Sequence, residues 1–216
     1  MKSLPYFSGL SQAELDAISN FTFEKSFGKG EAIILEGDHA EALYFIAAGA
    51  AKCFKTSEDG KEQILQILIP GNSFNDVAVF DGGPSPTSIE AMSMVNLCGI
   101  AKHDVVKILN DYPKLFPNVV KVLTQRVRHL LELVEDLSFR HVINRIARVL
   151  LEYASDGAGQ KPRLTQQEMA SIAGTAREVV GRSLKTLQSE GLIRMERNRL
   201  VIADKKALEQ MASTAT

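Results

Sequence analysis

The chain has 216 residues, a formal net charge of −1 and an ordinary share of apolar and charged side chains. This length allows two small domains with separate cores, and the composition is typical of a globular protein. No signal peptide or membrane-spanning run is visible, and Cys53 and Cys98 lack metal-ligand spacing, so we expect a cytoplasmic protein without membrane contact. The charge is unevenly spread: residues 1–110 carry 8 basic and 14 acidic side chains, and residues 111–216 carry 17 and 12. A basic C-terminal half is typical of a nucleic-acid-binding domain.

The N-terminal half has the pattern of a β-sandwich or barrel. After a capped helix start at Ser11, glycines recur at positions 37, 49, 60, 71 and 82, spaced 11 or 12 residues apart. Short apolar or alternating runs lie between them, at 32–35, 43–47, 51–55, 63–69 and 95–100. Strands at this spacing, with a hairpin turn at Ser57–Gly60, predict an all-β domain. The pattern alone leaves open a cupin enzyme or a carbohydrate-binding module.

A long helix is predicted after Pro113 and Pro117. Apolar residues recur along it at spacings of 4 and 3: Phe116, Val120, Leu123, Val127, Leu130, Val134 and Leu137. This is the a/d seam of a coiled coil. About three heptads are the lower limit for predicting one, so an amphipathic helix that lies on the β domain is the alternative. The seam predicts a homodimer whose interface contains these side chains.

Residues 164–193 predict two short helices joined by a tight turn. Thr165 and Glu168 fit a capping box, in which a hydroxyl and a carboxylate three residues apart satisfy free amides at a helix start. Gly174 supplies the positive φ that ends this helix. Thr175 is expected to cap the second helix. Two helices with a short glycine turn make a helix-turn-helix.

The second helix carries the side chains of a DNA reader at its N-terminal end. Its apolar residues leave a polar face that contains Arg177, Glu178, Arg182 and Lys185. The N-terminal tip of a recognition helix meets base edges, where arginine can bind guanine O6 and N7 and glutamate can accept from cytosine N4. A solvated helix face is the alternative. The turn glycine and the predicted caps together favour DNA binding.

A β-hairpin is predicted over residues 191–202, with Asn198 in its turn. A hairpin that follows a helix-turn-helix forms a wing. Its arginines are placed to reach phosphates: Arg194, Arg197 and Arg199. Such contacts position a protein on DNA without reading its sequence.

Residues 163–203 resemble the winged helix-turn-helix of the cyclic-AMP receptor protein/FNR family. The run from Arg177 to Arg182 is similar to the recognition helix of the receptor-protein branch. The resemblance implies that Arg177, Glu178 and Arg182 read a TGTGA-type half-site of a palindromic operator in double-stranded DNA. It places further residues at backbone-contacting or nearby positions: Thr165, Gln167 and Lys185. The predicted DNA-binding set is completed by Thr175, Arg197 and Arg199. Val179 departs from that branch, which has a hydroxyl able to touch phosphate there.

Residues 30–109 resemble the cyclic-nucleotide-binding β-roll, a jelly roll, of the same family. In members that bind cyclic AMP, a Gly-Glu-Leu run holds the ribose through its glutamate, and an Arg-Ser-Ala run pairs with the phosphate through its arginine. The matching runs here are Asn75–Val77 and Pro86–Ser88. The missing arginine removes a bidentate, charge-assisted contact to phosphate, and Asp76 would repel a phosphate that lacks a counter-charge. The sequence therefore disfavours cyclic AMP and leaves a different effector or an empty cavity.

The resemblance also places the long helix against the effector pocket. The positions that hold adenine in the receptor protein correspond here to Leu130 and Leu131, which predicts an apolar pocket wall. The expected lining is Phe74, Asn75, Asp76, Val77, Pro86, Thr87, Ser88, Val127, Leu130 and Leu131. An apolar wall suits an apolar ligand or a haem, which some relatives use to sense gases such as NO and CO. No pair of histidines has ligand spacing, which weakens the haem alternative, and only His39 lies in the roll, which argues against a cupin enzyme.

These features predict an α+β protein that acts as a homodimeric transcription regulator and is not an enzyme. We expect an effector domain over 1–110, a dimerisation helix over 111–138 and a winged helix-turn-helix domain over 139–216. An unidentified effector would shift the two dimer helices and act through a hinge at Ser138–Arg145. It would do so by binding the two arrangements of the dimer with different affinity. The resemblance implies RNA polymerase as a partner of the loop Asp156–Lys161. A ligand-insensitive repressor or architectural protein and a cupin-like enzyme are the other classes left open.

Overall fold

The computed structural model describes residues 4–153, 162–196 and 199–213. The chain divides into two compact units. The first contains Met1–Lys55 and Gln66–His129. The second contains Thr56–Leu65 and Leu130–Thr216. Within the described residues, no helix combines the length and the apolar character that crossing a membrane requires.

The N-terminal segment begins with a 3₁₀ turn, Pro5–Phe7, followed by helix α1, Gln12–Ser19. Ser11 and Glu14 form a complete capping box at the start of α1. The strands follow: β1 Thr22–Phe27, β2 Ala32–Ile34, β3 Ala42–Ala48, β4 Ala51–Thr56, β5 Glu62–Leu68, β6 Ser73–Phe74, β7 Ser88–Ala91 and β8 Val95–Ala101. Helix α2, Asp76–Asp81, comes between β6 and β7 in the chain.

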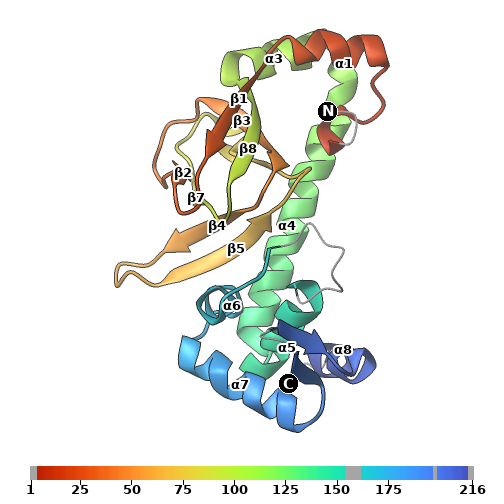
Figure 1. The fold of residues 1–216 in the computed structure, drawn as a ribbon. Coiled ribbons are helices and arrows are strands. Elements are labelled where there is room, and N and C mark those ends of the chain that lie inside the picture. The colour runs from red at the N-terminus through yellow and green to blue at the C-terminus, as the bar shows by residue number, and fades with distance from the viewer. Residues whose placement is uncertain (1–3, 154–161, 197–198, 214–216) are drawn as a thin grey trace. The chain divides into compact units, whose positions relative to one another are not determined.

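The strands form two four-stranded sheets, one in the order β1-β8-β3-β6 and the other in the order β2-β7-β4-β5 (Figure 1). β8 is central in the first sheet, where Gly99 pairs with Phe23 of β1 and Tyr44 of β3. A Cβ atom on Gly99 would lie 2.4 Å from the Phe23 ring, so the packing of this ring requires a glycine. Apart from the β4–β5 pair, neighbouring strands are not consecutive in the chain, as in a jelly roll.

The space between the two sheets is filled with apolar side chains. The buried residues of this interior cluster are Ile34, Ala42, Tyr44, Ile46, Ala51, Leu68, Phe74, Ile89, Ala91, Val95 and Leu97. Tyr44 stacks on Phe74 with 5.3 Å between ring centroids, and Phe23 meets Tyr44 edge to face. Burying each such ring stabilises the fold by roughly 1.5–3 kcal/mol.

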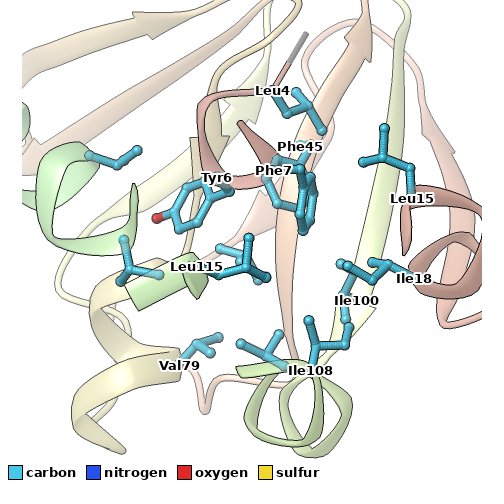
Figure 2. Packing of buried hydrophobic residues seen from close by; sticks show 14 residues of the cluster. Leu4, Tyr6, Phe7, Leu15, Ile18, Phe45, Val79, Ile100, Ile108 and Leu115 are labelled. Atoms are coloured by element: carbon cyan, nitrogen blue, oxygen red, sulfur yellow. The ribbon is translucent and has the colours of Figure 1, made fainter. Parts of the chain in front are cut away.

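A second cluster covers the outer face of the first sheet. Because successive side chains of a strand point to opposite faces, Leu43 and Phe45 of β3 point away from Tyr44 into this cluster. Helix α3, Lys102–Asp111, packs there with the N-terminal segment. Figure 2 shows Leu4, Tyr6 and Phe7 gathered around Phe45, with Leu15, Ile18, Ile100 and Ile108 beyond them. The N-terminal segment is therefore part of the core of the first unit.

A 3₁₀ turn, Pro113–Leu115, leads into the long helix α4, Phe116–Phe139. Leu115, Val119 and Val122 are buried in the outer cluster of the roll. After a break, the C-terminal elements follow: α5 Val142–Tyr153, α6 Gln166–Ala173, α7 Arg177–Ser189, β9 Ile193–Glu196, β10 Arg199–Ile202 and α8 Lys205–Ser213. Their shared core contains Ile146, Ala147, Leu150, Ala170, Ala173, Val180, Leu187, Leu192, Ile193, Leu208 and Ala212.

The predicted α+β class is confirmed, with a β-roll, a long helix and a winged helix-turn-helix in that order. The five predicted strand runs correspond to β2, β3, β4, β5 and β8, and the Ser57 amide closes the predicted hairpin by donating to Lys61 O at 2.9 Å. The elements β1, β6, β7, α2, α3, α5 and α8 are not among the predictions. The sequence of β1 hides its strand because only Phe23 and Phe27 are apolar in Thr22–Phe27.

Candidate functional site

The first helix of the helix-turn-helix starts as predicted. Thr165 is the N-cap of α6, and its hydroxyl accepts the Glu168 amide at 3.2 Å. The Glu168 carboxylate in turn accepts the Thr165 amide at 2.6 Å. Gln167 lies in the first turn and is exposed. The capping box commits the Thr165 hydroxyl to the helix start and leaves Gln167 free to face solvent.

Gly174 ends α6 in the left-handed conformation, with φ +60°. A Cβ atom at this position would lie 2.5 Å from Leu137 Cδ2 and 3.1 Å from Gln63 Oε1. Glycine is therefore needed at the turn for two reasons, the positive φ and the close approach of neighbouring side chains. The predicted turn is confirmed, and the contact with Leu137 could not be read from sequence spacing.

The second helix begins one residue later than predicted. Ala176 is the N-cap of α7 and makes no side-chain cap hydrogen bond, so the prediction that Thr175 caps this helix is wrong. The Thr175 amide instead donates to Ala170 O at 3.0 Å, which continues the hydrogen bonding of the α6 end through the turn. Thr175 is half-buried. Thr175 is therefore the single residue between Gly174, the C-cap of α6, and Ala176, the N-cap of α7.

The two faces of α7 separate as the sequence indicates. Val180, Ser183 and Leu187 are buried, and Val180 and Leu187 are fully enclosed in the domain core. The opposite face is exposed and contains Arg177, Glu178, Arg182 and Lys185. Arg177 and Glu178 form the first turn of the helix, so their side chains stand at its N-terminal tip. Within the described residues, no ion pair commits any of these four charged side chains.

The wing is an antiparallel hairpin in which Ile193 pairs with Ile202 and Glu196 pairs with Arg199. Arg194 makes an ion pair with Glu196 at 2.7 Å, and both side chains are largely exposed. Arg199 begins β10, and the predicted phosphate contact Arg197 and turn residue Asn198 lie outside the described residues. The hairpin is confirmed, and Arg194 would have to leave Glu196 to reach a phosphate.

The segment that matches the ribose-binding run turns sharply into α2. Asn75 has φ +66° and is the only described residue other than glycine with a positive φ. Its Nδ2 donates to Ala42 O at 2.9 Å, whereas its Oδ1 is buried without a hydrogen-bond partner in the described part of the chain. Phe74 is buried between the sheets, and Val77 is exposed. Asparagine fits here because its short polar side chain tolerates the left-handed region.

Asp76 is 1% exposed, and both of its carboxylate oxygens have partners. The Tyr6 hydroxyl donates to Oδ2 at 2.8 Å, and Arg126 Nη1 donates to Oδ1 at 2.6 Å. Arg126 Nη2 also donates to Ser73 Oγ at 3.0 Å and to the Ser73 carbonyl. Burial, followed by the charge of Asp76, raises the pKa of Tyr6 well above its usual value, so this hydroxyl remains a donor. The carboxylate is thus held between the N-terminal segment and α4.

The loop that matches the phosphate-binding run also has committed polar groups. The Cys53 thiol donates to Thr87 Oγ1 at 3.3 Å, and Ser88 Oγ accepts the Glu36 amide at 3.0 Å. Burial raises the pKa of Cys53, which keeps the thiol protonated. Pro86 is exposed, and its carbonyl accepts from Lys55 Nζ at 3.1 Å. Lys55 is a cation beside this loop that sequence reasoning missed, and Glu36 neutralises it in an ion pair.

Six of the seven predicted seam residues have exposed side chains on α4. Val119 and Val122 face the roll and are buried. Leu123, a predicted seam residue, is partly buried against the same cluster. The remaining seam residues are 37–60% exposed: Phe116, Val120, Val127, Leu130, Val134 and Leu137. Leu131, predicted to line the effector pocket, is 63% exposed. The alternative that this helix only lies on the roll accounts for one of its apolar faces and leaves the other unexplained.

Comparison with known proteins identifies the family. Residues 24–112 match the cyclic nucleotide-binding domain, and residues 144–211 match the Crp-like helix-turn-helix domain. The cyclic AMP receptor protein of Thermus thermophilus is 30% identical over 212 residues, which cover 98% of each chain. The chain belongs to the CRP/FNR family of transcription regulators. The CRP-like cAMP-activated global transcriptional regulator of Mycobacterium tuberculosis is 28% identical over 95% of each chain. A crystal structure of a CRP-family transcriptional regulator from Thermus thermophilus has a TM-score of 0.73 at 27% identity and covers 88% of this chain and 97% of that chain.

As a member of the CRP/FNR family, the protein is a DNA-binding transcription regulator. Its relatives are transcription regulators and not enzymes, which removes the cupin-like alternative. The family resemblance inferred from the recognition helix and the roll is therefore confirmed.

The structure adds residues that sequence reasoning missed in this CRP/FNR chain. Tyr6 and Arg126 hold Asp76 although they are 70 and 50 residues away from it in the chain. Arg126 carries a weak signal in the sequence, because it is an arginine one position before the seam residue Val127. Tyr6 carries none, since an aromatic residue in a short N-terminal turn is most often a packing residue.

Proposed function

We propose that the protein is a homodimer that recognises a palindromic operator through α7 and responds to an effector other than cyclic AMP. The exposed arginines at the tip of α7 carry this proposal. Arg177 and Arg182 extend from a helix whose opposite face is fixed in the core by Val180 and Leu187. A rigid helix with uncommitted guanidinium groups at its N-terminal end suits base recognition in the major groove.

In this proposal, Arg177, Glu178 and Arg182 contact base edges of a TGTGA-like half-site. The remaining members of the DNA-binding set contact the phosphate backbone or lie beside it: Thr165, Gln167, Thr175, Lys185, Arg197 and Arg199. The exposure of Gln167 and Lys185 supports such contacts. Thr165 and Thr175 would contribute through the backbone geometry of the turn, because the Thr165 hydroxyl already serves as a cap.

Dimerisation follows from the exposed seam of α4. A stripe of large apolar side chains that stays in water is unfavourable, and pairing two such stripes as a coiled coil removes them from it. One recognition helix reads too few bases, whereas two helices about 34 Å apart read successive major-groove turns. We assign residues 1–110 to the effector domain, 111–138 to the dimerisation helix and 139–216 to the DNA-binding domain.

The effector site is proposed at the segments 74–77 and 86–88 and on α4 at Val127, Leu130 and Leu131. The relatives from Thermus thermophilus and Mycobacterium tuberculosis are named for cyclic AMP. Here Asp76 is 1% exposed and accepts from Tyr6 and Arg126, so a ribose hydroxyl could reach it only if the surrounding side chains moved. The loop also carries no arginine for the phosphate. The cation beside this loop, Lys55, is already paired with Glu36. These commitments support an effector of different chemistry, and the unpartnered Asn75 Oδ1 would accept a hydrogen bond from it.

Haem is the alternative effector within the family. An axial ligand in a buried haem site requires a histidine or another donor that is held inside the protein. All four histidines are exposed on the described chain: His39, His103, His129 and His141. This arrangement favours a small apolar metabolite over haem. RNA polymerase is the proposed partner in activation, and the loop proposed to contact it, 156–161, lies outside the described residues.

The DNA proposal is tested with palindromic duplexes that carry TGTGA and TCACA half-sites, compared with scrambled duplexes at moderate salt. We expect a sedimenting dimer that prefers the palindrome by about 10³-fold or more. A monomer that binds every sequence equally would contradict the proposal. Effector-independent binding to the palindrome would favour a ligand-insensitive regulator.

The effector proposal is tested by calorimetry with cyclic AMP and by the absorption spectrum of the protein with and without added haem. We expect no saturable heat from cyclic AMP and no Soret band in a one-to-one complex. Binding of cyclic AMP in the micromolar range would overturn this part and restore the function for which the named relatives are known.

A further inference from the structure

The corner between α4 and α5 contains a cluster of arginines that the DNA-reading surface does not use. Helix α4 ends at Phe139 and α5 begins at Val142, so only two residues join the helices. Around this corner gather three arginines: Arg140, Arg145 and Arg148. We define the corner cluster as these three arginines together with Asp136 in the last turn of α4.

Arg145 closes the end of α4 from the first turn of α5. Its Nη1 lies 3.3 Å from the carbonyls of Asp136 and Leu137 and 3.1 Å from that of Arg140. The last carbonyls of a helix have no intrahelical donor and carry the negative end of its dipole, which a nearby cation stabilises. One side chain of α5 therefore satisfies the end of α4 and fixes the geometry of the joint.

Asp136 links the two other arginines of the corner cluster. Its Oδ1 accepts from Arg148 Nη1 at 2.6 Å and lies 2.8 Å from Arg140 Nε in an ion pair. The side chains of Asp136 and Arg140 are only 17% and 12% exposed. Glu135 lies 3.5 Å from Arg140 and is the other carboxylate at the corner. The shielded pair of Asp136 and Arg140 is screened less by salt than a surface pair is.

Arg140 also ties the corner to the C-terminal helix. Its Nη1 donates to Ala212 O at 2.9 Å, at the last turn of α8. Leu208 and Ala212 anchor α8 in the core of the DNA-binding domain beside Ile146 and Leu150 of α5. Arg140 thus makes an ion pair with Asp136 of α4 and donates a hydrogen bond to a helix that is fixed to the domain core.

We infer that the corner cluster sets the direction in which the helix-turn-helix core leaves the end of α4, and thereby the half-site spacing that the dimer accepts. The inference rests on the proposed function, since spacing has meaning only for a dimer on two half-sites. Each added base pair shifts a half-site by about 3.4 Å and rotates it by roughly 34°. If hydrogen bonds and ion pairs fix the corner, the dimer should bind well at one half-site spacing. If the corner lacks them, the dimer should bind at several spacings.

The test uses the full chain and palindromic duplexes whose TGTGA and TCACA half-sites lie about 10.5 base pairs apart centre to centre, with one or two base pairs added or removed. The variants are Arg140→Gln and Asp136→Asn. The matched control is Lys121→Gln, which removes one charge from an exposed position of the same helix. Affinity is measured at one fixed salt concentration for every spacing.

We expect the wild type and the control to lose roughly tenfold in affinity for each base pair away from the best spacing, because the DNA must be deformed to fit. Both corner variants should lose only about two- to threefold per base pair, with little change at the best spacing. Arg140→Lys keeps the charge but lacks the planar guanidinium group. Its loss of affinity per base pair should lie between that of the wild type and that of Arg140→Gln. Variants that keep the wild-type profile would overturn the inference, as would a wild type that selects half-site sequence but ignores spacing.

Failure of the proposed function gives a different result. A wild type that is monomeric or indifferent to half-site sequence refutes the proposed function itself. Amide hydrogen exchange then examines the corner alone. Arg140→Gln should speed exchange in the last turn of α4 and in α8 while α7 keeps its protection, and unchanged exchange in both segments would rule out a bracing role for the corner cluster.

Discussion

The β-roll and the DNA-binding domain use their charged side chains in opposite ways. In the roll, Asp76 is buried and both of its oxygens are bound by Tyr6 and Arg126. On α7, the side chains of Arg177 and Arg182 are exposed, and no ion pair of the described residues engages them. A buried charge without a partner is costly, so folding commits it to internal bonds, whereas an exposed charge is solvated by water.

This difference decides what each site offers a ligand. DNA that reaches Arg177 has to displace only water. Asp76 is 1% exposed, so a ligand can reach it only if the side chains around it move. The α7 side chains therefore stay available for the proposed contact with DNA, whereas the segment that matches the ribose-binding run of the family joins α2 to the N-terminal segment and to α4.

The largest predicted effect tests the roll side of this comparison. Arg126→Met leaves the Asp76 carboxylate buried without its cation and should lower the free energy of unfolding by ~3 kcal/mol. Tyr6→Phe removes one hydrogen bond from the same carboxylate and should cost about 1–2 kcal/mol. Urea unfolding measures both. A loss below about 0.5 kcal/mol for Arg126→Met would mean that Asp76 is free for a ligand, and the contrast between the two regions would disappear.

On the DNA side, Arg177→Ala and Arg182→Ala should each cost ~1–3 kcal/mol of specific binding and relax base choice at one position of each half-site. Stability should change by less than about 0.5 kcal/mol, because these side chains are exposed. Lys185→Ala is the control for a phosphate contact and should weaken binding to all sequences alike. Competition titrations with single-base variants of the operator measure this. Equal losses on every sequence for the arginine variants would reassign them to the phosphate backbone.

The turn of the reader domain should be sensitive to a single methyl group. Gly174→Ala adds a Cβ at φ +60° and brings it against Leu137, so we expect a loss of ~1–2 kcal/mol in stability. Gly181→Ala is the matched control, because its Cβ would meet only Gln166 Oε1 at 3.7 Å. In the interior of α7, alanine should stabilise by roughly 0.5–1 kcal/mol. Thermal unfolding that shows equal effects for the two substitutions would contradict the packing described at the turn.

Substitutions at the helix caps should change stability less, and they should differ between α6 and α7. Thr165→Ala removes the capping-box hydroxyl of α6 and should cost about 1 kcal/mol. Thr175→Ala should cost less than about 0.5 kcal/mol, because the cap position of α7 is Ala176. Ala176→Ser should stabilise α7 by roughly 0.5–1 kcal/mol by supplying the missing acceptor. Chemical denaturation of the three variants distinguishes them, and a large loss from Thr175→Ala would restore the cap expected from sequence.

The smallest predicted effect concerns pH and an exposed pair on the roll. The hydrogen bond from Lys114, and then that from the Ser11 amide, lower the pKa of Glu14 to about 2. A lowered carboxyl pKa means that this interaction stabilises the fold above the unfolded pKa of roughly 4.3 and is lost as the pH falls toward 2. Glu14→Gln should be less stable than the wild type at pH 7, and the two should converge near pH 2. Unfolding curves across this range measure it, and a constant difference would show that Glu14 acts through packing alone.

Local signals made the helix-turn-helix predictable. A capping box and a glycine turn are encoded within a few residues, and they fix where α6 and α7 start and stop. Thr165 and Gly174 behave as the sequence indicates for this reason. The prediction that Thr175 caps α7 was wrong because the sequence does not show whether a threonine lies at the N-cap or one residue before it. The geometry of the turn decides this.

For the segment proposed to bind the effector, the sequence did not reveal the hydrogen bonds. The run around Asp76 and the loss of an arginine near Thr87 could be aligned with the family signature. The partners Tyr6 and Arg126 could not, because they come from elements far away in the chain. The corner cluster was also hidden, since Ala212 meets Arg140 only after α8 folds against α5.

The sequence by itself determined the order of the β-roll, the long helix and the helix-turn-helix, the apolar seam of α4 and the arginines on the polar face of α7. These follow from periodicity and capping, which act within one or two turns of a helix. Only the tertiary structure decided which charges remain available, because burial depends on neighbours that are distant in the chain. Desolvation then ties Asp76 to Tyr6 and Arg126, whereas Arg177 stays in water, available for the proposed contact with DNA.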